Sequence, residues 1–310
     1  MKKLMIFVCL MVFLIPSLSA DRLFNGLHFE FSTGAESFSA PVKINDFDIF
    51  RYETFITIGE GELSYQYIYT LSLRDNNAIE KQNRVFAMAK MQGPLCEVYG
   101  KIGVLQFSEE LLGGLKFRWQ DEFHGDIEGS QYLEFMGKAM TSRPYNVPFW
   151  AIGTKIYFIK TEKITLNVNG EFSKFRTKKF YLDVMYNKES VQFDDMNLYL
   201  DKIVVDFDNI KNQMLKLGIQ VDINGKNFSP WLNIGYVFYE TILEGKYTSE
   251  YINYDFESID IQNFSTKSKL INTLLLSSGV RMKIAKNFEI EASAFMGALN
   301  GAGLSWIILL

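Results

Sequence analysis

The chain has 310 residues, of which 32 are Lys or Arg and 36 are Asp or Glu, giving a net charge of −4 at pH 7. Its basic residues are scattered, so the sequence lacks the concentrated positive charge of a nucleic-acid-binding protein. With 27 Phe, 16 Tyr and only 6 Pro, the composition favours β-strands, and after the N-terminus no segment reaches the roughly 18 apolar residues of a membrane helix.

The first 20 residues have the pattern of a secretory signal peptide. Lys2 and Lys3 precede a continuous apolar core at 4–15, and a Pro-Ser-Leu-Ser-Ala break follows at 16–20. We expect cleavage after residue 19 or 20. Cys9 lies inside the apolar core, which argues against a lipoprotein anchor. The remaining chain, 21–310, is expected to form one domain without an internal disulfide, because Cys96 is its single cysteine.

Alternation of apolar and polar residues predicts strands along most of the remaining chain. Tyr65, Tyr67 and Tyr69, for example, alternate with Gln66 and Thr70, as expected of a strand with one apolar and one polar face. The predicted strands are 27–32, 50–58, 62–73, 85–92, 96–104, 150–158, 163–172, 215–223, 232–238, 274–284, 288–296 and 304–310.

Short and long connections alternate between these strands. The short turns are 59–62, 93–94, 160–162, 224–227 and 285–287, and the long loops are 33–49, 74–84, 108–148, 176–211 and 241–270. Periplasmic turns and extracellular loops alternate in this way in bacterial outer-membrane barrels, which have an even number of strands. Over 23–310 the chain therefore resembles the bacterial outer-membrane β-barrel class, although it ends in Leu310 where an aromatic residue is commonest.

The predicted fold is all-β, an antiparallel up-and-down transmembrane β-barrel of about 12 strands, with 10 or 14 as alternatives. An extra hairpin at 115–119 and 133–135 would either give fourteen strands or project above the membrane. The alternation alone also fits a soluble barrel or sandwich. Because a barrel much wider than eight strands cannot fill its interior with side chains, we expect the apolar rows to face lipid and the polar rows to face the lumen.

Charges of both signs lie on the faces assigned to the lumen. The predicted lumenal acids are Glu30, Glu53, Glu62, Glu97, Glu171, Asp222, Glu289 and Glu291, and the predicted lumenal bases are Arg51, Lys90, Lys101, Lys155, Lys163, Lys216, Arg281 and Lys283. A strongly selective pore would carry a ring of one sign. The even mixture predicts either cross-strand ion pairs that narrow or plug the interior, or charges that only hydrate it.

Catalytic and metal-binding patterns are absent from the sequence. The two histidines are His28 and His124, and neither lies in a recognisable arrangement of nucleophile and base. We find no spacing typical of a hydrolase, a zinc site or a phosphate-binding loop. We therefore expect no enzyme activity, no cofactor and no metal.

A cluster of cations follows the seventh predicted strand. Lys174, Arg176, Lys178 and Lys179 could pair with lipopolysaccharide phosphates or extend a solvated strand. The expected partners are outer-membrane lipid, lipopolysaccharide and the barrel-assembly machinery, and nucleic acid is not expected. The predicted function is a non-catalytic outer-membrane barrel that acts as a narrow channel or as a surface-exposed structural or binding protein. A barrel hydrolase and a soluble periplasmic β-protein are the alternatives.

Overall fold

The structure is a computed structural model that describes residues 27–309 apart from 46, 59–62, 122–126, 141–146, 179, 184–190, 194–197 and 254–255. Side chains are described for 27–45, 77–110, 147–178, 209–246, 263 and 265–309. The predicted signal peptide at 1–20 lies outside the described residues. No helix in the described part of the chain is both long and apolar enough to cross a membrane.

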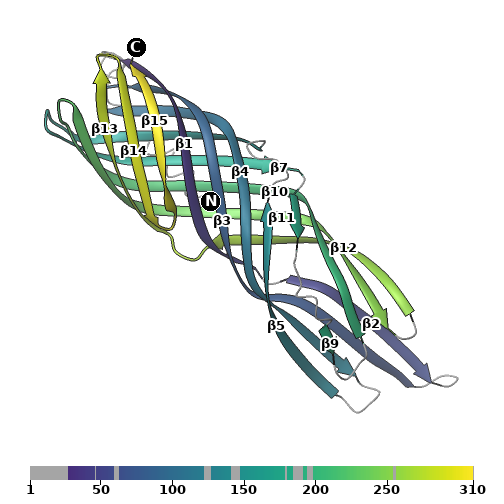
Figure 1. Ribbon diagram of the computed structural model, residues 1–310. Coiled ribbons are helices and arrows are strands. Elements are labelled where there is room, and N and C mark those ends of the chain that lie inside the picture. The colour runs from purple at the N-terminus through teal and green to yellow at the C-terminus, as the bar shows by residue number, and fades with distance from the viewer. Residues whose placement is uncertain are drawn as a thin grey trace.

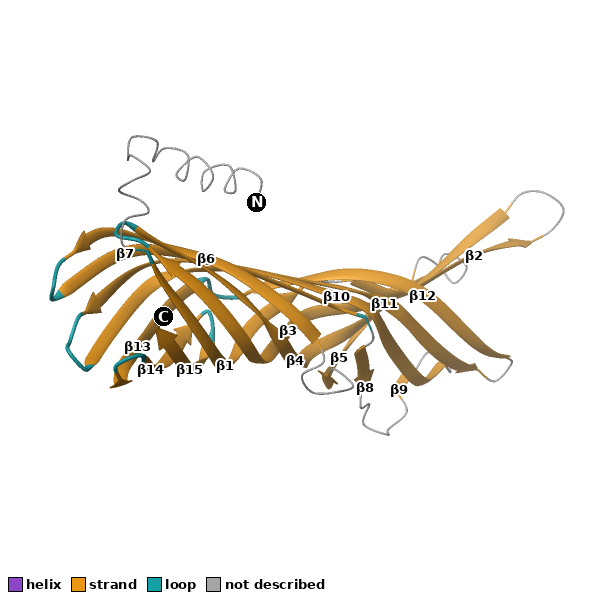
Figure 2. Ribbon diagram, turned by 90° about the horizontal axis from the view of Figure 1, so that it is seen from above, coloured by secondary structure: helices purple, strands orange, loops and turns teal. Residues whose placement is uncertain are grey.

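The described residues form strands joined by short loops (Figures 1 and 2). The strands are β1 His28–Ile44, β2 Phe47–Ile58, β3 Leu63–Gln92, β4 Cys96–Asp121, β5 Ile127–Met140, β6 Val147–Lys160, β7 Ile164–Thr177, β8 Phe180–Asp183, β9 Val191–Phe193, β10 Leu198–Ile223, β11 Phe228–Asn253, β12 Phe256–Leu270, β13 Leu274–Ala285, β14 Phe288–Gly297 and β15 Asn300–Leu309.

Within the described residues, ten strands close into an antiparallel barrel. The order around the barrel is β1, β3, β4, β6, β7, β10, β11, β13, β14 and β15, and β15 pairs with β1 to close the ring. The predicted antiparallel barrel is confirmed. The predicted count of about twelve strands is not confirmed. The alternative count of ten agrees with this ring.

The difference of two strands arises between Phe47 and Gln92. β2 follows β1 and pairs with β3 outside the ring, and β3 runs without a break through the predicted loop 74–84. The predicted loop 33–49 is likewise mostly strand. Ile58 and Leu63 pair at the far end of the molecule, so the prediction that 59–62 groups with the other short turns is wrong.

The two ends of the barrel differ. The turns that follow β3, β6, β10 and β13 lie at one end, together with the start of β1 and the end of β15, and we call this the turn end (Figure 1). At the opposite, extended end, β3, β4, β10 and β11 continue far beyond the ring. There β2, β5, β8, β9 and β12 pair with them and with one another, which accounts for most of the predicted long loops. The predicted extra hairpin forms here, between β4 and β5, so it adds no strand to the ring.

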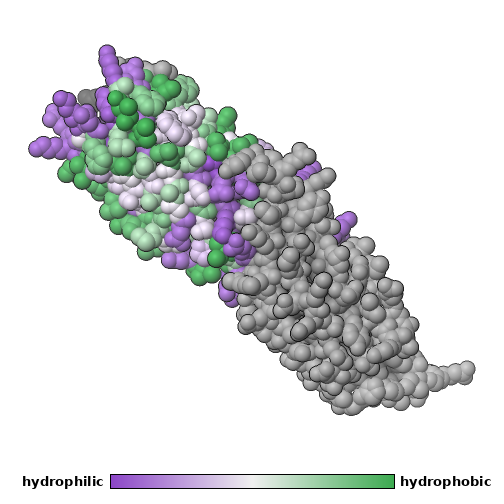
Figure 3. Space-filling view, in the orientation of Figure 1, coloured by the Kyte–Doolittle hydropathy of each residue, from purple (hydrophilic) through white to green (hydrophobic). Residues whose placement is uncertain are grey.

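Apolar side chains face outward over the turn-end half of the barrel. On β4, Val98, Ile102 and Val104 are exposed, with Ile102 at 69%, and Gln106 and Ser108 follow on the same face. Figure 3 shows this apolar surface, bounded by polar side chains toward the extended end.

The apolar stretch has the length that a membrane requires. On β10 it covers 215–223, which matches the roughly 9–11 residues of a membrane-spanning strand. Toward the extended end, the next two residues on the same outward face are the polar Gln213 and Lys211. We call these outward apolar segments the lipid-facing band. The outward polar residues next to it on the side of the extended end, such as Gln106 and Ser108 on β4 and Gln213 and Lys211 on β10, we call the belt. The outward direction of the apolar rows agrees with the predicted membrane barrel, because a soluble barrel would turn them inward.

Candidate functional site

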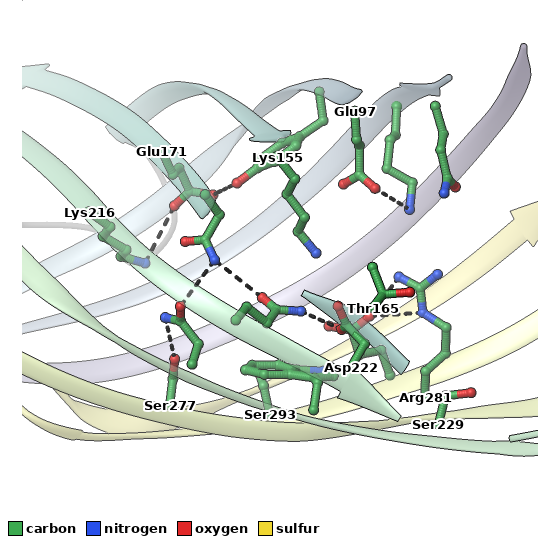
Figure 4. Close-up of a pocket in the computed structure, with 18 of the residues that line it drawn as sticks. Glu97, Lys155, Thr165, Glu171, Lys216, Asp222, Ser229, Ser277, Arg281 and Ser293 are labelled. Carbon is green, nitrogen blue, oxygen red and sulfur yellow. Dashed lines mark hydrogen bonds and ion pairs between the residues drawn. The ribbon is translucent and has the colours of Figure 1, made fainter. Parts of the chain in front are cut away.

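The interior of the lipid-facing band holds a polar chamber of about 440 Å³ (Figure 4). Strand alternation sends every second side chain into it. The chamber reaches from Lys160 and Asn224 near the turn end to Glu36 near the belt. Most of the predicted lumenal charges line it, namely Lys90, Glu97, Lys101, Lys155, Glu171, Lys216, Asp222, Arg281, Glu289 and Glu291.

One charge cluster surrounds Arg281. Its guanidinium lies 2.9 Å from the Glu291 carboxylate, 3.6 Å from Glu30 and 3.7 Å from Glu289. Lys90 pairs with Glu30 at 2.6 Å. These contacts link β1, β3, β13 and β14 across the interior, so the mixed charges here form ion pairs.

A second charge cluster lies between β1, β4, β7 and β10. The Lys101 ammonium bridges Glu171 at 2.7 Å and Glu36 at 3.1 Å, and Lys216 approaches Glu171 at 3.4 Å. The Tyr99 hydroxyl donates a hydrogen bond to Glu171 at 3.1 Å. Glu171 on β7 therefore accepts contacts from three side chains, two on β4 and one on β10, and the two lysines balance the two carboxylates.

Glu36 is a chamber residue that sequence reasoning missed, because it lies in the predicted loop 33–49. In the structure β1 continues through this segment and turns Glu36 inward, on the same face as Glu30 and Ser32. Gly34 on the inner face and Ala35 on the outer face differ too little in polarity to predict a strand here.

Amide side chains on β7, β10 and β11 form hydrogen bonds in and beside the chamber wall. Asn167 and Gln220 donate hydrogen bonds to the Asp222 carboxylate at 2.8 and 2.6 Å. Asn169 donates to Asn233 at 3.0 Å. These uncharged residues were not among the predicted site residues, although their alternation along β7, β10 and β11 could have identified them.

A layer of packed side chains lies inside the barrel between the chamber and the extended end. The Arg84 guanidinium lies 4.9 Å from the ring centroids of both Phe38 and Phe149, and Phe107 packs on Phe175 with ring centroids 5.5 Å apart. All five side chains are 4% exposed or less. We call these five residues the closing layer. Arg84 also donates two hydrogen bonds to Gln82 at 3.0 and 2.7 Å, which fixes its guanidinium between the rings.

Close backbone approach makes room for this layer. A Cβ at Gly103 on β4 would lie 2.1 Å from the carbonyl oxygen of Val85 and 2.8 Å from a ring carbon of Phe149. A larger residue would therefore force the strands and the ring apart, so the absence of a side chain at Gly103 is part of how the layer packs.

Beyond the closing layer lies a pair of buried carboxylates, Glu80 and Glu109. They are direct partners on β3 and β4, and both are fully buried. Both lie past Val85 and Val104, which are the last exposed large apolar side chains toward the extended end in the described parts of β3 and β4, and so outside the lipid-facing band. Burial raises the pKa of Glu109 well above its ordinary value, and the charge of Glu80 raises it further. Burial also raises the pKa of Glu80, against the opposing effect of its hydrogen bonds.

The remaining predicted site residues lie elsewhere. Glu30 contacts Lys90 and Arg281 at the chamber edge. Lys283, Lys163 and His28 are exposed near the turn end. Lys174, Arg176 and Lys178 follow one another at the extended end of β7, where Arg176 donates a hydrogen bond to Asn209. The side chains of Arg51 and Glu53 are not among those described, and Glu62, His124 and Lys179 lie outside the described residues.

Comparison with known proteins gives similarity of fold only. No family model and no curated protein matches the chain. Among solved structures, the outer membrane protease OmpT from Escherichia coli has 9% identity and a TM-score of 0.36, covering 95% of this chain and 96% of its own. The β domain of the Bordetella autotransporter BrkA has 12% identity and a TM-score of 0.32, covering 90% and 98%. The hydrocarbon channel CymD has 10% identity and a TM-score of 0.28, covering 91% and 87%.

Similarities at this level say nothing of this chain's activity. The closed antiparallel ring and its outward apolar band decide the class. The chain has the fold of an outer-membrane β-barrel.

Proposed function

We propose that the protein is a non-catalytic, non-conducting outer-membrane barrel that holds the paired strands of its extended end at the cell surface. The closing layer is the observation that supports this proposal. Arg84 and the aromatic rings around it are almost completely buried, and the chamber below them ends near Glu36. An open pore would need a continuous polar path at this level.

The ion pairs of the chamber support the same function. Arg281 and Lys101 each contact two or more carboxylates, so the charges neutralise one another across strands. A narrow channel remains the alternative if the closing layer moves. A barrel hydrolase is less well supported, because His28, the one histidine among the described side chains, is exposed at the turn end.

The proposed orientation follows the usual arrangement of such barrels, with the turn end in the periplasm and the extended end outside the cell. Export would use the predicted signal peptide at 1–20, and insertion would use the barrel-assembly machinery. In this orientation Lys174, Arg176 and Lys178, three of the four cations of the predicted cluster, would lie near the outer leaflet, where lipopolysaccharide phosphates are available.

Planar-bilayer recordings test the proposed closure. We expect the purified wild-type protein to show no steady conductance. The triple variant Phe38→Ala, Arg84→Ala, Phe149→Ala should conduct, because it removes the side chains that fill the interior above the chamber. Lys155→Ala is the matched control, since it enlarges only the chamber and should stay silent.

Folding of each variant is checked by the change in gel mobility on boiling. Steady wild-type conductance of the size expected for a general porin would contradict the proposal. Equal conductance of Lys155→Ala and the triple variant would show that the closing layer is not the barrier.

A further inference from the structure

We propose that Glu80 and Glu109, with the oxygen atoms around them, form a binding site for a divalent cation, and that Ca²⁺ is the ion that fits it best. The site lies inside the barrel beyond the closing layer, outside the lipid-facing band. It is separate from the chamber and does not depend on whether the barrel conducts.

The two carboxylates face each other across neighbouring strands. Glu80 on β3 and Glu109 on β4 are direct partners, a relation that places Cβ atoms about 4.5–5.5 Å apart. Both are fully buried. Like charges in this arrangement repel and are costly to bury without a partner, so the pair must be neutralised, either by protons or by a bound cation.

The described cationic side chains near this pair form contacts with other residues. Lys81 faces outward and pairs with Glu110 at 2.8 Å. Arg84 donates to Gln82 and lies between aromatic rings. Among the described side chains, none forms an ion pair with Glu80 or Glu109.

Unpartnered oxygen atoms point to a ligand. Both carboxylate oxygens of Glu109 are buried without a hydrogen-bond partner, and so is the amide oxygen of Asn212. Asn212 belongs to the same group, because its amide nitrogen donates to Thr241 at 2.9 Å, and the Thr241 hydroxyl donates to Glu80 at 2.8 Å. Three acceptors in one buried group therefore lack donors, as expected where a cation binds.

The chemistry of the group favours a hard divalent ion. Its polar atoms are carboxylate, amide and hydroxyl oxygens. The hydroxyls of Tyr239 and Ser268 also belong to the group, because each donates a hydrogen bond to the Glu80 carboxylate. Ca²⁺ takes about 6–8 such oxygens in flexible geometry, whereas Mg²⁺ usually retains several waters. Because both carboxylates are fully buried, the group suits the ion that needs fewer waters. Two positive charges also balance the two carboxylates.

Terbium luminescence on the full-length protein in detergent tests the site, since Tb³⁺ replaces Ca²⁺ and is sensitised by a nearby tyrosine such as Tyr239. After prolonged incubation, we expect saturable binding to the wild type that Ca²⁺ displaces. Loss of an outer-sphere partner alone typically weakens metal binding by about 10–100-fold, so Glu109→Gln, which removes a ligand, should weaken binding at least as much.

Glu110→Gln is the matched control, because it makes the same charge change one residue along β4 on the outward face. It should bind like the wild type. A second measurement compares the temperature of the gel-mobility change in Ca²⁺ and in chelator, and only proteins with an intact site should be stabilised by Ca²⁺. The proposal would be overturned if the wild type showed no saturable Tb³⁺ binding, or if Glu109→Gln bound Tb³⁺ as well as the wild type. A shared proton would then be what neutralises the pair.

Discussion

Replacing Arg281 with Glu is expected to lower the free energy of unfolding of the barrel by about 3 kcal/mol, near the lower end of the range for breaking a buried ion pair. Arg281 contacts Glu30, Glu289 and Glu291, and the variant would place a fourth carboxylate among them. The lower end applies because the Arg281 side chain keeps 29% exposure. Urea unfolding in lipid vesicles measures the change.

Lys283→Glu is the control for this variant. It makes the same charge change two residues along β13, but Lys283 is exposed at the turn end. Surface substitutions usually change stability by about 0.5 kcal/mol or less. Equal destabilisation by the two variants would show that the contacts of Arg281 are not specific. Because the closing layer lies above this cluster, we expect neither variant to open a conducting path.

Replacing Ile102 with Lys should oppose membrane insertion by about 2–4 kcal/mol, the cost of a cation at the middle of the lipid face of a barrel. Ile102 is 69% exposed and lies within the lipid-facing band. Folding yield into vesicles, read from gel mobility, measures the effect.

Gln106→Lys is the matched control on the same strand and the same face. Gln106 lies in the belt, where a cation costs only about 0–1 kcal/mol. Similar folding yields for the two variants would contradict the position of the lipid-facing band.

Sequence reasoning predicted the membrane half of the barrel well. There, outward residues meet lipid and inward residues meet a polar chamber, so alternation identifies both the strand and its lipid-facing side. Trp150 and Ile152 on β6, and Leu232 and Ile234 on β11, face outward as predicted.

The same reasoning failed beyond the belt, where the solvent outside the barrel changes from lipid to water. On β1, Phe38, Ala40 and Val42 face inward and are buried, whereas Lys43 faces outward. The strand keeps its direction, but the apolar face is now the inner one. This change made 33–49 and 74–84 resemble loops, and it concealed the closing layer and the Glu80–Glu109 pair.

Cysteine labelling in intact cells tests the closed interior and its orientation most directly. In a Cys96→Ser background, Ser293→Cys places a thiol in the chamber, and Lys246→Cys places one on the exposed face of β11 beyond the belt. We expect a membrane-impermeant maleimide added outside to label Lys246→Cys at once, and Ser293→Cys only after the outer membrane is permeabilised. Rapid labelling of Ser293→Cys in intact cells would contradict the account, because the chamber would then be open to the outside.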